Sequence, residues 1–135
     1  MEGKLELIVL PVSDIDRAKA FYTDKLDFNL DEDHRAGDFR VVQLTPRGSS
    51  CSISTVSRNA SPAGSTPVKG RHLVVPDIEG AHAELGERGA ETSEIYHLEA
   101  GRRVPGPDPA RARYGSFFSL ADLDGNGWMV EEVRP

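Results

Sequence analysis

The sequence predicts an α+β protein of two tandem βαβββ units whose strands form a curved mixed sheet around a cleft. First, the phrase Val12-Ser-Asp-Ile-Asp-Arg-Ala18 returns as Val75-Pro-Asp-Ile-Glu-Gly-Ala81. Second, each copy ends an apolar run and begins a helix-periodic one; third, short strand-like runs follow each helix. We therefore expect a first unit at residues 1–57, a connector at 58–69 and a second unit at 70–135, with a ligand cleft between the units.

The first unit begins with a strand at Leu5–Val12, which is apolar on both faces like a strand covered from both sides. Ser13 is expected to cap the following helix, with Asp16 three residues later as an acidic variant of the capping box. The apolar residues of this helix recur at helical spacing: Ile15, Ala18, Tyr22 and Leu26. Three short strands are expected next, at Phe28–Asp33, Phe39–Leu44 and Cys51–Val56.

The second unit repeats this order. A strand at Arg71–Val75 precedes a helix at Asp77–Arg88, and Gly89 stands just past the helix end, where a left-handed residue is favoured. A strand is expected at Glu91–His97. The last two strands are expected at Tyr114–Leu120 and Trp128–Val133. The turn Asp122–Gly127 joins them, with its glycine and asparagine residues supplying positive φ angles.

Between these strands, Leu98–Arg113 is expected to be a long loop, because it is rich in proline and arginine and has no periodicity. One interpretation is a plain solvated loop on an acidic protein. The other is a lid that recruits an anionic ligand through Arg102 and Arg103.

Composition excludes several kinds of partner. Acidic residues outnumber basic ones by 22 to 16 and the net charge is −6, which argues against a nucleic-acid partner. No apolar stretch approaches the roughly 20 residues of a membrane span, so no membrane partner is expected. The single cysteine, Cys51, excludes an internal disulfide and a cysteine-rich zinc site. We expect a cytoplasmic protein.

Two segments resemble the vicinal oxygen chelate superfamily, which includes glyoxalase I, extradiol dioxygenases, fosfomycin resistance enzymes and bleomycin-binding proteins. Val12–Tyr22 reads Val-x-Asp-Ile-Asp-x-Ala-x-x-Phe-Tyr, and Phe118–Trp128 reads Phe-x-x-x-Asp-x-Asp-Gly-Asn-Gly-Trp. The resemblance extends over essentially the whole chain and implies a glyoxalase-like fold and a homodimer. Neither motif is catalytic, because the first begins a helix and the second makes a turn.

Metal-dependent members of this superfamily bind a divalent ion through four side chains on the strands of the two units. Matching the motifs places these four positions at Leu7, at Ile53 or Ser54, at Gly70 and at Met129. None of these residues supplies the imidazole or carboxylate ligands that zinc, iron or magnesium require. We therefore expect no metal and no cofactor.

His72 lies two residues beyond Gly70, so the two face the same side of a strand. Two alternatives stay open for it: a cleft imidazole that hydrogen-bonds a ligand or acts as a base, or a packed core histidine. Glu131 shares a face with Met129, whereas Glu132 faces the opposite side and needs a partner if it is buried. His34, His82 and His97 are expected at the surface. The residues expected to line the ligand site are Leu7, Val9, Ser54, His72, Tyr114, Phe117, Met129 and Glu131.

The leading functional hypothesis is a metal-independent binder of a small apolar or aromatic molecule, of the bleomycin-resistance type, with its ligand in the cleft between the units. Two alternatives remain open. One is a metal-dependent or His72-dependent lyase or dioxygenase of the same superfamily. The other is a non-catalytic partner of a larger enzyme. The same scaffold carries unrelated chemistries, so fold alone does not choose between them.

Overall fold

The computed structural model describes residues 1–56 and 67–135, which divide into two compact units. Unit 1 comprises Met1–Val68 and Asp122–Asn126, and unit 2 comprises Lys69–Ala121 and Gly127–Pro135. Most of the expected connector at 58–69 lies outside the described residues. Within the described ranges, no helix has the length and apolar character that crossing a membrane requires.

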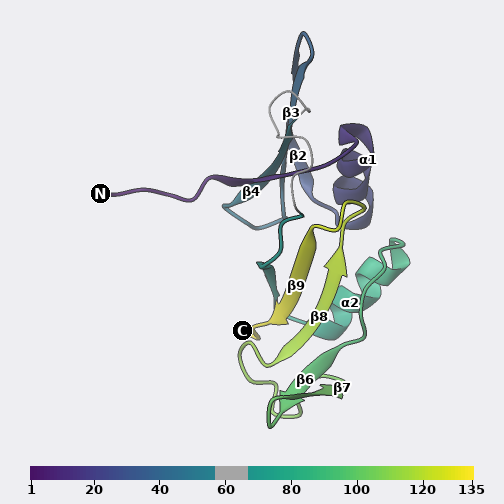
Figure 1. Ribbon diagram of the computed structural model, residues 1–135. Coiled ribbons are helices and arrows are strands. Elements are labelled where there is room, and N and C mark those ends of the chain that lie inside the picture. The colour runs from purple at the N-terminus through teal and green to yellow at the C-terminus, as the bar shows by residue number, and fades with distance from the viewer. Residues whose placement is uncertain (57–66) are drawn as a thin grey trace. The chain divides into compact units, whose positions relative to one another are not determined.

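Unit 1 is a four-stranded mixed sheet with one helical segment beside it (Figure 1). Its elements are β1 (Leu7–Leu10), α1 (Ile15–Ala20), the π-helical turn η1 (Phe21–Lys25), β2 (Asn29–Ala36), β3 (Phe39–Thr45) and β4 (Ser52–Val56). The strand order is β1-β4-β3-β2, with β1 parallel to β4 and the other pairs antiparallel. The core is formed by Leu10, Ala18, Phe21, Tyr22, Leu26, Phe28, Val42, Leu44 and Ile53.

The helix of unit 1 begins one residue later than the sequence predicted. Asp14, not Ser13, is the N-cap, and its carboxylate accepts a hydrogen bond from the Arg17 backbone N–H at 3.1 Å. The Ser13 backbone N–H donates instead to Asp124 Oδ1 at 3.0 Å. The helix does end at Leu26, but its last turn is π-helical, which the periodicity did not reveal.

The turn of the second motif, Asp122–Asn126, belongs to unit 1, where it contacts the first motif and the residue before it, whereas the strand residues on either side of the turn belong to unit 2. The Tyr22 hydroxyl donates to Asp122 at 2.7 Å, and the Asn126 side-chain amide donates to the Pro11 carbonyl at 2.9 Å. Within this turn, Gly125 alone has a positive φ, at 80°. The expectation that Asn126 also has a positive φ was wrong: Asn126 is buried, and its side chain stabilises the turn by donating to Asp122 and to the Pro11 carbonyl.

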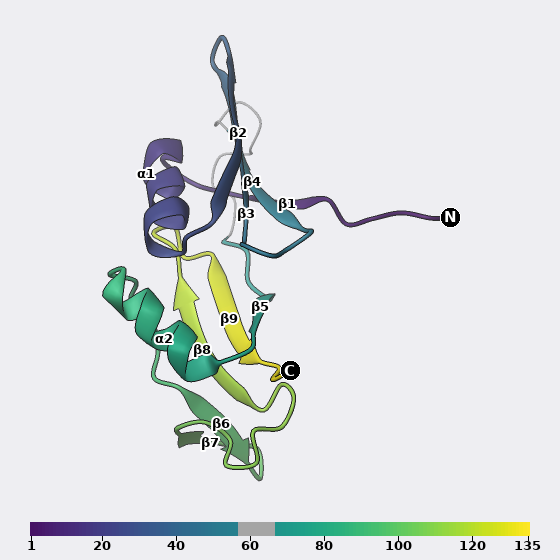
Figure 2. The ribbon, with the colours of Figure 1, turned by 180° about the vertical axis from the view of Figure 1, so that it is seen from behind.

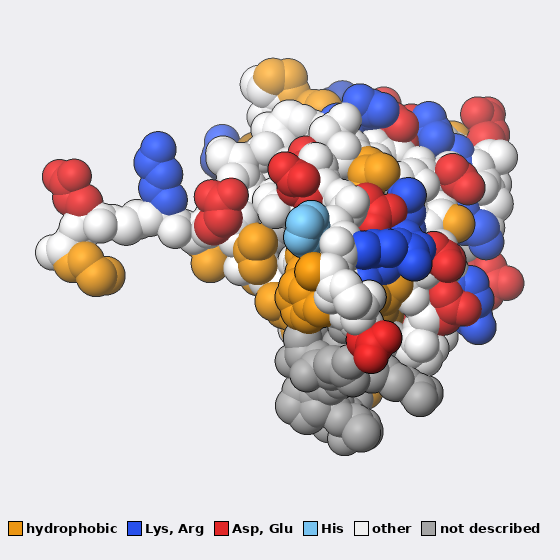
Figure 3. Space-filling view, turned by 90° about the horizontal axis from the view of Figure 1, so that it is seen from above, with side chains coloured by type: hydrophobic (Ala, Val, Ile, Leu, Met, Phe, Trp, Pro, Cys, Tyr) orange, Lys and Arg blue, Asp and Glu red, His pale blue; other side chains and the backbone are white. Residues whose placement is uncertain are grey.

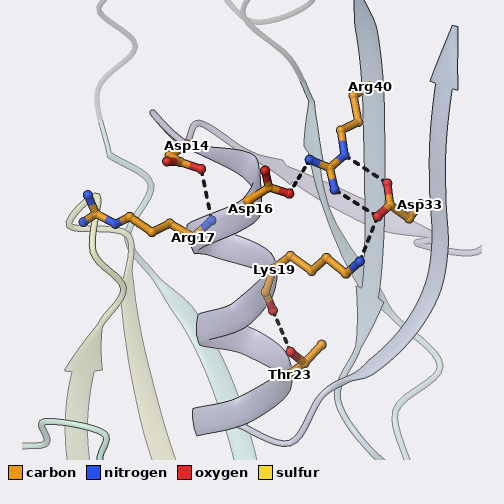
Figure 4. Close-up of polar contacts among 7 residues, drawn as sticks. All are labelled: Asp14, Asp16, Arg17, Lys19, Thr23, Asp33 and Arg40. Atoms are coloured by element: carbon orange, nitrogen blue, oxygen red, sulfur yellow. Dashed lines mark hydrogen bonds and ion pairs between the residues drawn. The ribbon is translucent and has the colours of Figure 1, made fainter.

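An ion network joins α1 to strands β2 and β3 (Figure 4). Arg40 donates to Asp16 at 2.7 Å and to Asp33 at 2.9 Å, and Lys19 donates to Asp33 at 2.9 Å. Hydrogen bonds from Arg40 and then Lys19 hold the pKa of Asp33 far below its usual range. Figure 3 shows Asp and Glu side chains next to Lys and Arg side chains on part of the face that it displays.

Unit 2 repeats the topology of unit 1 and adds one strand. Its elements are β5 (Arg71–Val75), α2 (Ile78–Glu87), β6 (Tyr96–Glu99), β7 (Arg102–Pro105), β8 (Ser116–Ala121) and β9 (Gly127–Glu132). The strand order is β5-β9-β8-β6-β7, so its first four strands match β1-β4-β3-β2. Asp77 caps α2 with φ and ψ of −144° and 103°, close to the −142° and 111° of Asp14. The predicted α+β, glyoxalase-like fold is confirmed.

The expected loop at Leu98–Arg113 is in part a β-hairpin, so the prediction of a long loop without strands was wrong. Strands β6 and β7 pair in antiparallel fashion, with Glu99 opposite Arg102. Opposite charges on facing residues stabilise such a pair, and β7 is an edge strand, where Pro105 is tolerated. Arg102 and Arg103 are therefore strand residues.

Candidate functional site

The two faces of the sheet in unit 2 differ in what covers them. Helix α2 lies against one face (Figure 2): His82 packs edge-on to Phe118 at 5.0 Å, and the Ile78 backbone N–H donates to Glu132 at 2.9 Å. Successive strand residues point to opposite sides, so their neighbours face away from α2. This helix-free face carries His72, Val74, Tyr96, Leu98, Phe117, Ser119, Met129 and Glu131.

A histidine–carboxylate pair stands at one edge of the helix-free face. His72 Nδ1 lies 2.6 Å from Glu131 Oε1, and the histidine side chain is 50% exposed whereas that of Glu131 is 11% exposed. The alternative of a packed core histidine was therefore wrong. A carboxylate only accepts hydrogen bonds, so in the neutral imidazole the hydrogen is on Nδ1 and Nε2 is an acceptor. Among the described residues, the imidazole has no second hydrogen-bond partner.

A stacked aromatic pair occupies the middle of the same face. The rings of Tyr96 and Phe117 lie 5.5 Å apart at 30°, and the Tyr96 hydroxyl donates to the Met129 sulfur at 3.6 Å. The Arg103 guanidinium lies over the Tyr96 ring at 4.2 Å. Arg103 thus reaches the face from strand β7, whereas Arg102, its neighbour on the strand, points to the other side.

These groups form one continuous strip across the sheet. Met129 is the direct cross-strand neighbour of His72, and Glu131 is the neighbour of Phe117, which in turn faces Tyr96. From β5 to β7 there are four strand-to-strand steps of about 4.8 Å, or roughly 19 Å in all. The strip has a histidine–carboxylate pair at one end, an aromatic and thioether middle, and the Arg103 guanidinium over the Tyr96 ring of that middle. This arrangement suits a flat molecule with polar edges.

The sequence-based expectation left Tyr96 out of the ligand residues and placed Tyr114 on a strand. Tyr96 was expected within a strand, but its face depends on pairing with Phe117, which the sequence does not display. Tyr114 lies in the turn before β8 with a φ of 56°, about half exposed, and not on a strand.

The remaining expected ligand residues belong to unit 1. Val9 and Ser54 are direct cross-strand neighbours on β1 and β4, and Leu7 shares their side of the sheet. Ser54 is buried and Val9 is half exposed. Ile53 points into the core, so Ser54 is the one of the two alternatives that shares a face with Leu7.

The family's metal positions carry residues with other roles. Gly70 has a φ of 83°, a left-handed conformation that favours glycine and disfavours any residue with a side-chain ligand. Met129 accepts the Tyr96 hydroxyl. In the part of the chain that the structure describes, no group of three or more His, Cys, Asp and Glu side chains is arranged to hold a metal ion.

The helix-facing side of the sheet holds a second buried carboxylate, Glu132, with a structural role. Arg111 donates to both of its oxygens, at 2.9 and 2.8 Å, as the sequence required of a buried glutamate. Arg111 and the Ile78 backbone N–H hold the pKa of Glu132 down at about 2. The prediction that His97 lies at the surface was wrong: its side chain is buried, and Nδ1 donates to the Gly106 carbonyl at 2.8 Å, a contact that raises the pKa of His97.

Comparison with known proteins agrees with this architecture. Residues 4–130 match the Glyoxalase/Bleomycin resistance protein/Dioxygenase superfamily. The chain is 23% identical over 134 residues to the uncharacterized protein YetH of Bacillus subtilis, covering 98% of this chain and all of YetH. It is also similar to TnmS3, an antibiotic binding protein from Streptomyces sp. CB03234, with a TM-score of 0.74, 26% identity, and coverage of 97% and 96% of the two chains. A superfamily member from Sphaerobacter thermophilus shares the fold, with a TM-score of 0.75, 22% identity and coverage of 98% of each chain.

Proposed function

Because the chain belongs to the Glyoxalase/Bleomycin resistance protein/Dioxygenase superfamily, we propose that it binds a small aromatic molecule on the helix-free face of unit 2, without a metal ion. The observation that carries this proposal is the stacked Tyr96–Phe117 pair with the Met129 sulfur beside it. The antibiotic-binding activity of TnmS3, a protein of similar sequence and fold, supports it.

The aromatic strip is suited to binding because it is already ordered. Tyr96 is buried beneath Arg103 and bonded to Met129, whereas Phe117 and Met129 keep part of their surface accessible. A ring stacked on such residues gains about 0.5–1.5 kcal/mol beyond its area burial, and a thioether at a ring edge adds to this. Little ordering entropy is lost when the receiving side chains are already fixed.

Metal-independent binding is supported by the residues at the family's metal positions. Leu7, Gly70 and Met129 offer at most one thioether, and Ser54 offers only a hydroxyl. His72 and Glu131, each two residues along the strand from one of these positions, hydrogen-bond to each other.

The test is a fluorescence titration with 1-anilinonaphthalene-8-sulfonate, an aromatic probe, on the protein and on two variants. Phe117→Ala is expected to weaken binding about tenfold or more, through loss of stacking and apolar contact. Phe39→Ala, which removes an exposed phenylalanine from unit 1, is the matched control and is expected to bind normally. Equal loss in both variants, or stoichiometric metal whose chelation abolishes binding, would contradict the proposal.

A second candidate function, a metal-independent lyase, is favoured by the His72–Glu131 pair. A carboxylate that fixes one imidazole nitrogen leaves the other available as a general base, at 50% side-chain exposure. If the protein is such an enzyme, His72→Ala abolishes turnover of a bound aromatic compound and leaves its binding largely intact. Unchanged compound after prolonged incubation with the intact protein would leave binding as the function.

A further inference from the structure

The His72–Glu131 pair offers a ligand one specific polar contact. Glu131 is buried and accepts from Nδ1 at 2.6 Å, so the hydrogen that a neutral imidazole carries is engaged inside the protein. The exposed part of the ring therefore presents Nε2, which is an acceptor. A ligand group placed there must bring a hydrogen-bond donor.

The residues around His72 Nε2 indicate what kind of molecule would carry the hydrogen-bond donor. Met129 stands beside His72 and Phe117 stands beside Glu131, so the donor must be attached to an apolar, ring-shaped body. We propose that the ligand is a phenol, whose ring lies against Phe117 and Met129 and whose hydroxyl donates to His72 Nε2. This inference rests on the proposed function and specifies the substrate class of the same face.

Competing ligand groups fit this end of the strip less well. A carboxylate would bring its lone pairs to an acceptor nitrogen, next to the negative charge of Glu131. The guanidinium of Arg103 lies over the Tyr96 ring on β6, three strands from β5 or roughly 14 Å at about 4.8 Å per strand, so it does not pair with a group held at His72 Nε2. An aliphatic alcohol would form the hydrogen bond but would lose the stacking contact.

The expected preference for a ligand with a hydroxyl group follows from the cost of leaving His72 Nε2 without a hydrogen-bond donor. When an otherwise identical ligand lacks the hydroxyl hydrogen, Nε2 loses its water without gaining a donor. One such hydrogen bond changes affinity by roughly tenfold. Because half of the His72 side chain is exposed, water limits the effect to that order and not to the much larger ratios of fully buried sites.

The experiment compares dissociation constants for two matched probes, 2-naphthol and 2-methoxynaphthalene, by titration calorimetry. The intact protein is expected to bind 2-naphthol roughly tenfold more tightly. His72→Phe, which keeps a ring but removes the acceptor, is expected to bind both probes about equally. His34→Phe is the matched control, because His34 is an exposed strand histidine of unit 1, and it is expected to retain the preference.

Each other outcome decides against the phenol. Equal affinity of the intact protein for the two probes would overturn it, while binding of both that is lost in Phe117→Ala would leave the proposed function standing. A preference that survives in His72→Phe would overturn the assignment to His72. If neither probe binds, both this inference and the proposed function fail. The comparison of the two probes on the intact protein tests the phenol preference without relying on the folding of any variant.

Discussion

Removing the charge of Glu132 should reveal how strongly the buried ion pair of unit 2 stabilises the fold. Glu132 is fully buried, accepts two hydrogen bonds from Arg111, and receives the Ile78 backbone N–H at the start of α2. Glu132→Gln keeps the shape and one acceptor but removes the carboxylate charge. Arg111 then stays partly buried without its main counter-ion.

The magnitude follows from the pKa of Glu132, which these contacts lower from 4.5 to about 2. At 1.36 kcal/mol per unit, this difference stabilises the folded state by about 3 kcal/mol at neutral pH. Because the folded pKa is the lower one, the stabilisation is complete above about pH 4.5 and is lost progressively as the pH falls toward 2. Urea unfolding at pH 7 should show Glu132→Gln to be less stable by about 3 kcal/mol.

The control is Glu79→Gln, because Glu79 also pairs with Arg111, at 2.7 Å, but is 59% exposed. Its loss should cost less than about 1 kcal/mol, as for other surface ion pairs. The difference between the protein and Glu132→Gln should shrink as unfolding is repeated at pH 4 and pH 3. A difference that is independent of pH, or that is no larger than that of Glu79→Gln, would refute the assignment of the low pKa to a stabilising buried pair.

Three further predictions concern unit 1, the two helix caps and assembly. Asp14→Ala should lower the free energy of unfolding by about 1 kcal/mol, because the Asp14 carboxylate accepts a hydrogen bond from the Arg17 backbone N–H. Asp77→Ala should lower it by less, because the Asp77 side chain makes no capping hydrogen bond. Thermal melts of the two variants compare these effects directly. Arg40→Met should destabilise the protein by about 1–2 kcal/mol at pH 7 and by less at pH 2.5. Arg40 lowers the pKa of Asp33, so their ion pair stabilises the folded state above the ordinary carboxyl pKa, and this stabilisation is lost as the pH falls and Asp33 is protonated. Urea unfolding at the two pH values tests this. Sedimentation at tens of micromolar should give a homodimer, as the superfamily resemblance implies, and a strict monomer would remove this expectation without affecting the fold.

The repeated phrase was sufficient to predict the fold because its signals are local. An apolar run, a capping residue and a helical period identify a βα junction from a few adjacent residues, and both copies do so at Asp14 and Asp77. The choice between Ser13 and Asp14 as the cap was not local. Both residue types cap helices well, and Asp14 is the cap because the Ser13 N–H bonds Asp124, 111 positions away in the sequence.

The site was predictable only where the face of each strand residue could be inferred. His72, Met129 and Glu131 were expected to share a side, and the strand pairing brings them together as neighbours. Strand β8 contains two adjacent phenylalanines and β6 contains Tyr96 beside His97, so alternation in the sequence did not decide which residue faces the helix. The strand pairing decides it, by placing Tyr96 opposite Phe117.

The two adjacent glutamates of β9 distinguish a structural contact from a functional one. Both are buried, and a buried carboxylate is costly unless it is paired. Glu132 pairs with Arg111 and with the first turn of α2, so all of its contacts stabilise the fold. Glu131 pairs with an imidazole that is half exposed on the face away from the helix, a contact that orients His72 toward whatever lies on that face. Glu131 therefore orients an exposed imidazole, whereas every contact of Glu132 lies within the fold, and this is why we place the ligand beside His72 and not beside Glu132.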